Sequence, residues 1–127
     1  MQKEPLVSIS YITYNQIAFV ERAINGFLIQ KTEFPFEIYI HDDASTDGTA
    51  ELLHEYELKY PDVIRVVFEK ENQYSKRGHL FQYCIMPYIN SKYIAHCDGD
   101  DYWTDPYKLQ KQVTYLENHP DCSGTCQ

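Results

Sequence analysis

The chain has 127 residues, enough for one domain with its own core, and its 43% hydrophobic and 24% charged residues are ordinary for a globular protein. The net charge of −8 argues against non-specific nucleic-acid binding, which needs clustered lysine and arginine, but leaves open a phosphorylated ligand reached through a metal ion. No apolar run approaches the length of a bilayer span and the N-terminus has no apolar signal core, so we expect a cytoplasmic protein.

Short apolar or alternating runs predict four strands. They cover residues 6–12, 36–40, 63–68 and 93–97. Strand and helix patterns alternate along the chain, which is typical of an α/β fold with a mainly parallel open sheet and helices on both faces.

Apolar positions at helical spacing predict four helices between and after these strands. They cover residues 16–31, 49–60, 79–90 and 106–118. Asn15 is the expected N-cap of the first helix, and Asp105-Pro106 the expected cap and first residue of the last one.

The four cysteines are too few for a disulfide scaffold in a chain of this length. Cys84 and Cys97 lie in apolar segments and are interpreted as small buried side chains. Cys122 and Cys126, with His119 nearby, fit no zinc-binding spacing well and are interpreted as free thiols.

Three polar clusters directly follow predicted strands, at residues 13–15, 42–45 and 98–101. Because the carboxyl ends of parallel strands meet at one edge of a sheet, we expect these clusters to be neighbours in space. The turn at residues 14–17 has no glycine, so the first strand-to-helix turn lacks the signature of a dinucleotide site. The sequence also contains no Walker-type loop and no Gly-x-Ser-x-Gly nucleophile elbow.

The third cluster holds three carboxylates, Asp98, Asp100 and Asp101, within four positions. Like charges this close repel, so the loop needs a cation, hydrogen-bond donors or full solvation. Oxygen ligands of this kind suit Mg²⁺ or Mn²⁺. The alternative interpretation is a solvated acidic turn without a ligand.

Three segments together resemble the N-terminal, nucleotide-sugar-binding half of a family-two glycosyltransferase with the Rossmann-like GT-A fold. They are residues 7–15 (VSISYITYN), 37–49 (EIYIHDDASTDGT) and 93–101 (YIAHCDGDD), and their order and spacing match. Residues 101–109 also resemble bacterial members that act on surface polysaccharides. The resemblance covers nearly all of residues 1–127 and implies a single donor-binding domain.

The resemblance implies a role for each matching position. The nucleotide sugar would be bound by Thr13, Tyr14, Asn15, Asp42, Asp43, Arg77 and Asp98. Tyr14 would contact the base, Asp43 would accept a hydrogen bond from it, and Arg77 would reach the base or the diphosphate. Asp98 and Asp100 would be the Asp-x-Asp pair that holds Mg²⁺ or Mn²⁺, with Asp100 and Asp101 as the catalytic carboxylates.

Several of these residues also have purely structural interpretations. Asn15 would then only cap a helix, and the aspartates at residues 43–47 would only shape a turn. Arg77 would form a solvated pair with Lys76. For Trp103 the structural interpretation is packing on the edge of the sheet, and the alternative is stacking on a sugar.

The implied activity is an inverting, metal-assisted transfer from a nucleoside-diphosphate sugar, UDP-linked, to a saccharide or lipid-linked acceptor in surface or capsular polysaccharide synthesis. The family's general base lies beyond residue 127, so we expect a truncated chain that binds donor and metal but transfers sugar poorly. We also expect self-association through surface left uncovered, and a full-length protein peripheral to the inner face of the membrane. The alternatives are a nucleotidyltransferase, or a non-catalytic nucleotide- or metal-binding module.

Overall fold

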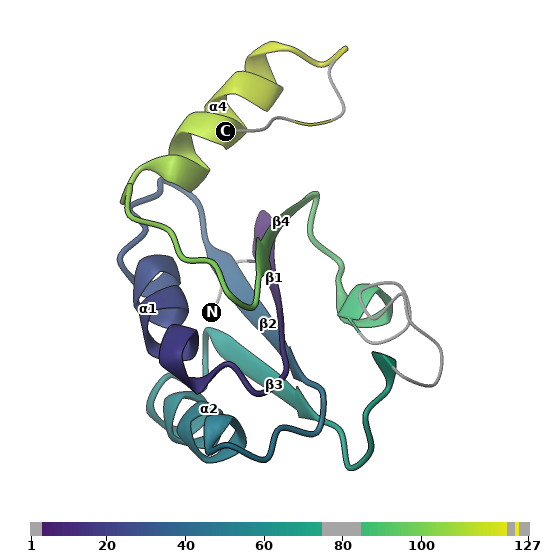
Figure 1. Ribbon diagram of the computed structural model, residues 1–127. Coiled ribbons are helices and arrows are strands. Elements are labelled where there is room, and N and C mark those ends of the chain that lie inside the picture. The colour runs from purple at the N-terminus through teal and green to yellow at the C-terminus, as the bar shows by residue number, and fades with distance from the viewer. Residues whose placement is uncertain (1–3, 75–84, 122–123, 125–127) are drawn as a thin grey trace.

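The structure, a computed structural model, describes residues 4–74, 85–121 and 124. Four parallel strands form one sheet in the order β3-β2-β1-β4 (Figure 1). The strands are β1 (Val7–Thr13), β2 (Phe36–Asp42), β3 (Ile64–Phe68) and β4 (Tyr93–Asp98). All four expected strands are confirmed, as is the parallel sheet.

Helices α1 (Ile17–Leu28) and α2 (Thr49–Lys59) lie side by side against one face of the sheet, and α4 (Lys108–Asn118) follows the acidic loop (Figure 1). A short 3₁₀ helix, η2 (Met86–Tyr88), lies toward the opposite side of the sheet. No helix in the described ranges is both long and apolar enough to cross a membrane.

The ends of three expected helices differ from the structure. Residues 79–84 lie outside the described part, and the helix expected to reach Asn90 gives way to extended backbone at Ile89. Asn15 does not cap α1, whose N-cap residue is Gln16. α4 begins at Lys108 rather than Pro106, because Asp105 first accepts the backbone N–H of Tyr107 and closes a turn.

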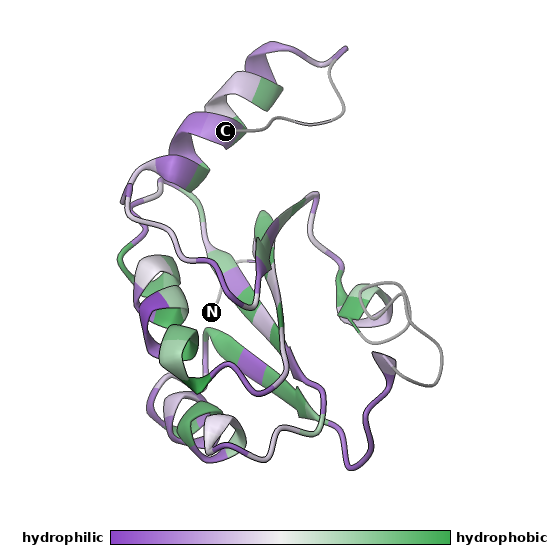
Figure 2. Ribbon diagram, viewed as in Figure 1, coloured by the Kyte–Doolittle hydropathy of each residue, from purple (hydrophilic) through white to green (hydrophobic). Residues whose placement is uncertain are grey.

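Strand alternation divides the sheet into an apolar and a polar face. On β1, Val7, Ile9 and Tyr11 belong to the buried core under the helices, together with Ile38 and Ile40 of β2. Figure 2 shows hydrophilic residues interrupting the apolar ones along these strands. The regular alternation explains why the strands were recognisable in the sequence.

The opposite face is polar even where it is buried. Ser8 and His41 are 0% exposed. The Ser8 hydroxyl donates to Glu37 at 2.8 Å and lies 2.7 Å from the hydroxyl of Ser91. These hydrogen bonds satisfy the Ser8 hydroxyl, which would otherwise be costly to bury, whereas of the two ring nitrogens of His41 only Nε2 has a described partner, Glu69 at 3.3 Å.

Phe27 of α1 joins the sheet to the segment after the acidic loop. Its ring makes edge contacts with Tyr11, at 5.5 Å between centroids, and with Trp103, at 4.8 Å. Trp103 is 6% exposed, and the Lys108 ammonium lies 4.7 Å from the centre of its ring. The packing interpretation of Trp103 is therefore confirmed.

Replacement of Gly26 should disturb this junction. A Cβ at Gly26 would lie 2.5 Å from the backbone oxygen of Trp103, so Gly26→Ala must push α1 away from that segment. We expect a loss of about 1–3 kcal/mol in the free energy of unfolding, measured by urea denaturation. Glu21→Ala, at an exposed position of the same helix, should change it by less than about 0.5 kcal/mol. Equal stability of Gly26→Ala and wild type would show that the contact is not tight.

Candidate nucleotide-binding site

A cavity of about 760 Å³ opens at the carboxyl ends of the strands. Its walls come from the end of β1, the loop after β3 and the acidic loop after β4. Four of the predicted site residues line it, namely Thr13, Tyr14, Asp98 and Asp100. The expectation that residues 13–14 and 98–100 are neighbours in space is therefore confirmed.

The wall after β1 is ordered by the side chain of Gln16. Its Oε1 accepts the Thr13 hydroxyl at 3.1 Å and the Tyr14 backbone N–H at 3.3 Å. Thr13 is 1% exposed, whereas Tyr14 keeps 47% of its surface exposed. An aromatic ring presented this way can pack against a planar base.

The acidic loop is tied to the core through a buried tyrosine. The Tyr11 hydroxyl donates to the backbone oxygen of Gly99 at 2.8 Å, and a Cβ at Gly99 would lie 2.8 Å from the Ile12 oxygen. Burial raises the pKa of Tyr11 well above its usual range, so the phenol stays a donor. Only glycine fits between the two strand ends here.

Asp98, Asp100 and Asp101 are all exposed around this glycine. The backbone N–H of Asp101 donates to the backbone oxygen of Asp98 at 3.0 Å and closes the turn. Asp101 accepts the N–H of Tyr102 at 2.8 Å and does not line the cavity. A catalytic role for Asp101 stays a prediction.

Burial raises the pKa of the Cys97 thiol, next in the chain, to about 12. Cys97 is 7% exposed, which confirms the interpretation of a small buried side chain. Cys84, Cys122 and Cys126 lie outside the described residues.

Asn15 connects two loops and is not among the residues lining the cavity. It adopts a positive φ of 50°, and its side-chain oxygen accepts the Thr46 N–H at 2.6 Å. Its own N–H donates to the Ser45 hydroxyl at 2.9 Å. The structure thus gives Asn15 a loop-joining role, and its contact with a ligand stays a prediction.

Asp47 completes the same junction by capping two helices at once. One oxygen accepts the Ile17 N–H at the start of α1, at 3.1 Å, and the other accepts the Thr49 N–H at the start of α2, also at 3.1 Å. Desolvation, the largest single influence, raises the pKa of Asp47, but the hydrogen bonds from the Thr49 hydroxyl and from these N–H groups together outweigh it and lower the pKa. This helix cap from a distant loop takes the place expected for Asn15.

Asp42 and Asp43 are each 1% exposed. Asp42 accepts the hydroxyl and the N–H of Ser45, at 2.5 and 3.3 Å. Burial raises the pKa of Asp42, and the hydrogen bonds from Ser45 only partly offset this. Asp42 is not among the residues lining the cavity, so its nucleotide contact also stays a prediction.

Asp43 binds the loop that follows β3. Its two carboxylate oxygens accept the backbone N–H groups of Gln73 and Tyr74, at 2.6 and 3.0 Å. Its backbone oxygen lies 3.4 Å from the side-chain nitrogen of Asn72. Arg77, expected to contact the ligand from this loop, lies outside the described residues.

Asn72 and Tyr74 line the cavity although no motif singled them out. β3 is parallel to the other strands and ends at the same edge, so the polar loop after it belongs to the same rim. The strand-end argument used for the other clusters would therefore have pointed to residues 69–74 as well.

The carboxylates that line the cavity supply part of what a hard divalent ion such as Mg²⁺ or Mn²⁺ needs as ligands. Within the described residues, no group of three or more histidine, cysteine, aspartate or glutamate side chains could hold a metal. Asp98 and Asp100 nevertheless supply two exposed carboxylates to one cavity, and Mg²⁺ and Mn²⁺ are commonly held by few carboxylates together with a ligand's phosphates.

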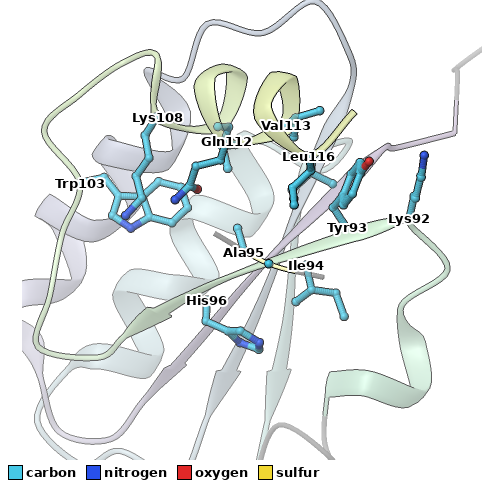
Figure 3. A pocket seen from close by; sticks show the side chains of 13 residues that line it. Lys92, Tyr93, Ile94, Ala95, His96, Trp103, Lys108, Gln112, Val113 and Leu116 are labelled. Carbon is cyan, nitrogen blue, oxygen red and sulfur yellow. The ribbon is translucent and has the colours of Figure 1, made fainter. Parts of the chain in front are cut away.

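A second cavity, of about 610 Å³, lies between β4 and α4 (Figure 3). Trp103 and Lys108 lie together at one end and Lys92 and Tyr93 at the other, with Val113 nearby on α4. None of the predicted site residues lines it. It borders the outer edge of β4, whose only described partner is β1.

Comparisons with known proteins agree on one protein family. A model of glycosyl transferase family 2 matches residues 8–126. An uncharacterised Mycobacterium tuberculosis protein, Rv1520, is 44% identical over 115 residues, covering 91% of this chain and 32% of that protein. TuaG of Bacillus subtilis, a putative teichuronic acid biosynthesis glycosyltransferase, is 33% identical over 113 residues, covering 89% of this chain and 42% of that protein.

The fold comparison agrees with the sequence comparison. The mannosyltransferase PcManGT from Pyrobaculum calidifontis, solved with GDP-Man and Mn²⁺, superposes with a TM-score of 0.74 at 25% identity. The match covers 90% of this chain and 33% of that one. The chain thus spans about a third of the length of the first relatives it matches, since the match covers 32% of Rv1520.

The double cap by Asp47 predicts a pH-dependent stability. Because its folded pKa is lower than its unfolded one, its contribution is present above the unfolded pKa and is lost as pH falls through the folded pKa. We expect Asp47→Ala to lose about 1–3 kcal/mol of unfolding free energy at pH 7, and the difference from wild type to shrink below about pH 4.

Urea denaturation across this pH range measures the effect. Asp47→Asn keeps one neutral acceptor oxygen and should lose less stability than Asp47→Ala, with a weaker dependence on pH. A constant difference between wild type and Asp47→Ala from neutral to acid pH would contradict the charged cap.

Proposed function

Since this chain belongs to glycosyl transferase family 2, we propose that residues 1–127 form the donor-binding domain of a glycosyltransferase. The domain binds a nucleoside-diphosphate sugar, UDP-linked, for transfer to an acceptor hydroxyl. One observation carries the proposal: Tyr14 after β1 and the carboxylates of Asp98 and Asp100 after β4 line the same cavity. An aromatic face and paired carboxylates suit the two ends of a nucleoside diphosphate.

In this proposal the cavity walls have separate tasks. Tyr14 packs against the base, and Thr13 lies beside the ribose. Asp98 and Asp100 hold Mg²⁺ or Mn²⁺, and such an ion supplies positive charge next to the diphosphate leaving group. The Mn²⁺ bound to PcManGT supports the choice of ion.

Asp100 and Asp101 are the proposed catalytic carboxylates on the leaving-group side. Inverting transfer also needs a base that accepts the proton of the acceptor hydroxyl. The proposal assigns that base to no residue of this chain, so donor binding is the activity to measure first.

The acceptor is proposed to be a saccharide or a lipid-linked saccharide of a surface polysaccharide. The support is the likeness to TuaG, which is named for teichuronic acid biosynthesis. Such an acceptor is consistent with a cytoplasmic protein that works at the inner face of the membrane.

Metal-dependent nucleotide binding tests the proposal. We expect calorimetry to detect UDP or GDP binding that strengthens when Mn²⁺ is added. Asp100→Ala and Asp98→Ala should each remove most of the gain from Mn²⁺, at least about tenfold in affinity, because each removes a carboxylate beside the diphosphate.

Asp62→Ala is the matched control, because this exposed aspartate precedes β3 at the opposite end of the sheet. Its affinity should equal that of wild type. Wild-type chain that bound neither nucleotide would overturn the proposal and favour a different binding module. Binding of a nucleoside triphosphate followed by release of pyrophosphate would instead favour a nucleotidyltransferase.

We also propose that the chain associates with itself along β4. This strand has β1 as its only described partner, Ile94 is 38% exposed, and apolar side chains line the adjoining cavity. An open strand edge next to apolar surface pairs readily with a second copy.

Sedimentation velocity at increasing concentration measures this association. Ile94→Lys places a charge on the open strand and should shift the chain toward monomer. Ile29→Lys makes the same change at the end of α1, at a side chain 48% exposed and away from β4, and should leave the distribution unchanged. A wild-type chain that stays monomeric at every concentration would contradict the proposal.

A further inference from the structure

The side chain of Gln16 connects the wall after β1 with the acidic turn after β4, and it lines the cavity of about 760 Å³. Its Oε1 accepts the Thr13 hydroxyl at 3.1 Å and the Tyr14 backbone N–H at 3.3 Å. A Cβ added to Gly99 would overlap this same oxygen and lie 2.7 Å from Cδ. The carboxamide group of Gln16 therefore lies directly over Gly99, in the middle of the acidic turn.

The hydrogen bond from Tyr14 fixes which arm of the carboxamide is the oxygen. A backbone N–H can only donate, so the atom of Gln16 that meets it must be Oε1 and not Nε2. The nitrogen carries two N–H donors, and in the part of the chain that the structure describes neither of them has a hydrogen-bond partner. Gln16 is only partly buried, so both donors are available to a ligand in the cavity.

Donors at this place complement the phosphates of a nucleoside diphosphate. Phosphate oxygens and the carboxylates of Asp98 and Asp100 are all acceptors, so these carboxylates can meet a phosphate only through a cation. Ribose hydroxyls, in contrast, can donate to a carboxylate directly. No lysine or arginine is among the described residues that line the cavity. The two N–H groups of Gln16 therefore supply donors beside a turn whose side chains only accept.

We propose that Gln16 is a diphosphate-binding residue, whose Nε2 donates to a phosphate oxygen while its Oε1 holds the wall that carries Tyr14. The backbone of Gln16 is fixed before a ligand binds, because its oxygen accepts the N–H groups of Phe19 and Val20, at 2.9 and 3.2 Å, in the first turn of α1. A donor held in this way loses little freedom on binding. The inference rests on the proposed function and adds to it a contact that no sequence motif assigned.

Comparison of UDP with uridine isolates the phosphate contact. Both ligands are titrated in the presence of Mg²⁺ into wild type, Gln16→Glu and Gln16→Met, and the affinities are measured from NMR chemical shifts. Gln16→Glu keeps an acceptor oxygen for Tyr14 but has no N–H donor, and Gln16→Met has neither and adds no charge. Each variant should lower the ratio of UDP affinity to uridine affinity about tenfold or more, because a hydrogen bond to a charged oxygen is lost.

Ala18→Glu is the matched control for the charge that Gln16→Glu introduces. It adds the same negative charge at an exposed position in the first turn of α1, and Ala18 does not line the cavity. Its ratio of UDP affinity to uridine affinity should stay within about twofold of wild type, because salt screens an exposed charge. Since each ratio is taken within one variant, a loss of stability alone does not change it.

Two results would overturn the inference while leaving the proposed function intact. One is an unchanged affinity of Gln16→Met for both ligands, which would show that the side chain does not contact the nucleotide. The other is an equal loss of UDP and uridine affinity in both Gln16 variants, because a role limited to supporting the wall weakens the two ligands alike. Wild type that binds neither UDP nor uridine would instead overturn the proposed function.

Discussion

The site depends on two carboxylates, the buried Asp43 and the exposed Asp47, that hold loops from distant parts of the chain. Asp43 binds the loop after β3 at 2.6 and 3.0 Å, and Asp47 binds the first turns of α1 and α2, each at 3.1 Å. Loop backbone at the end of a sheet has N–H groups that no strand or helix satisfies. Charged oxygens satisfy them more strongly than neutral ones, so a few aspartates can shape the whole rim.

The acidic loop is held in a different way, by a hydrogen bond from a residue of the hydrophobic core. Tyr11 packs against Phe27 at 5.5 Å between ring centroids and holds the Gly99 backbone at 2.8 Å, so the turn carrying Asp98 and Asp100 is tied to the most buried part of the sheet. The exposed carboxylates of this turn are therefore held by the core in a position from which they can contact a ligand. Rigid support matters because a binding group gains most when its position is set beforehand.

β3 and β4 are the two edge strands of the sheet. Of these, β4 borders a cavity of about 610 Å³ that separates it from α4 (Figure 3). The cavity of about 760 Å³ is at the carboxyl end of the sheet and β4 is at its side, so the proposed pairing along β4 and the proposed nucleotide binding would use different surfaces. The two properties can be examined independently.

The sequence by itself determined the parallel sheet, helices α1, α2 and α4, and the rim where Thr13, Tyr14, Asp98 and Asp100 meet. It could do so because strand alternation, helical spacing and polar strand ends are local patterns. Only the tertiary structure decided that Asn15 joins two loops, that Asp47 caps two helices, and that Asp43 points at residues 73 and 74. Apart from Thr49, which lies two positions from Asp47, the partners of these side chains lie 30 or 31 positions away. An aspartate at a strand end has the same local pattern whether it faces a ligand or a backbone N–H.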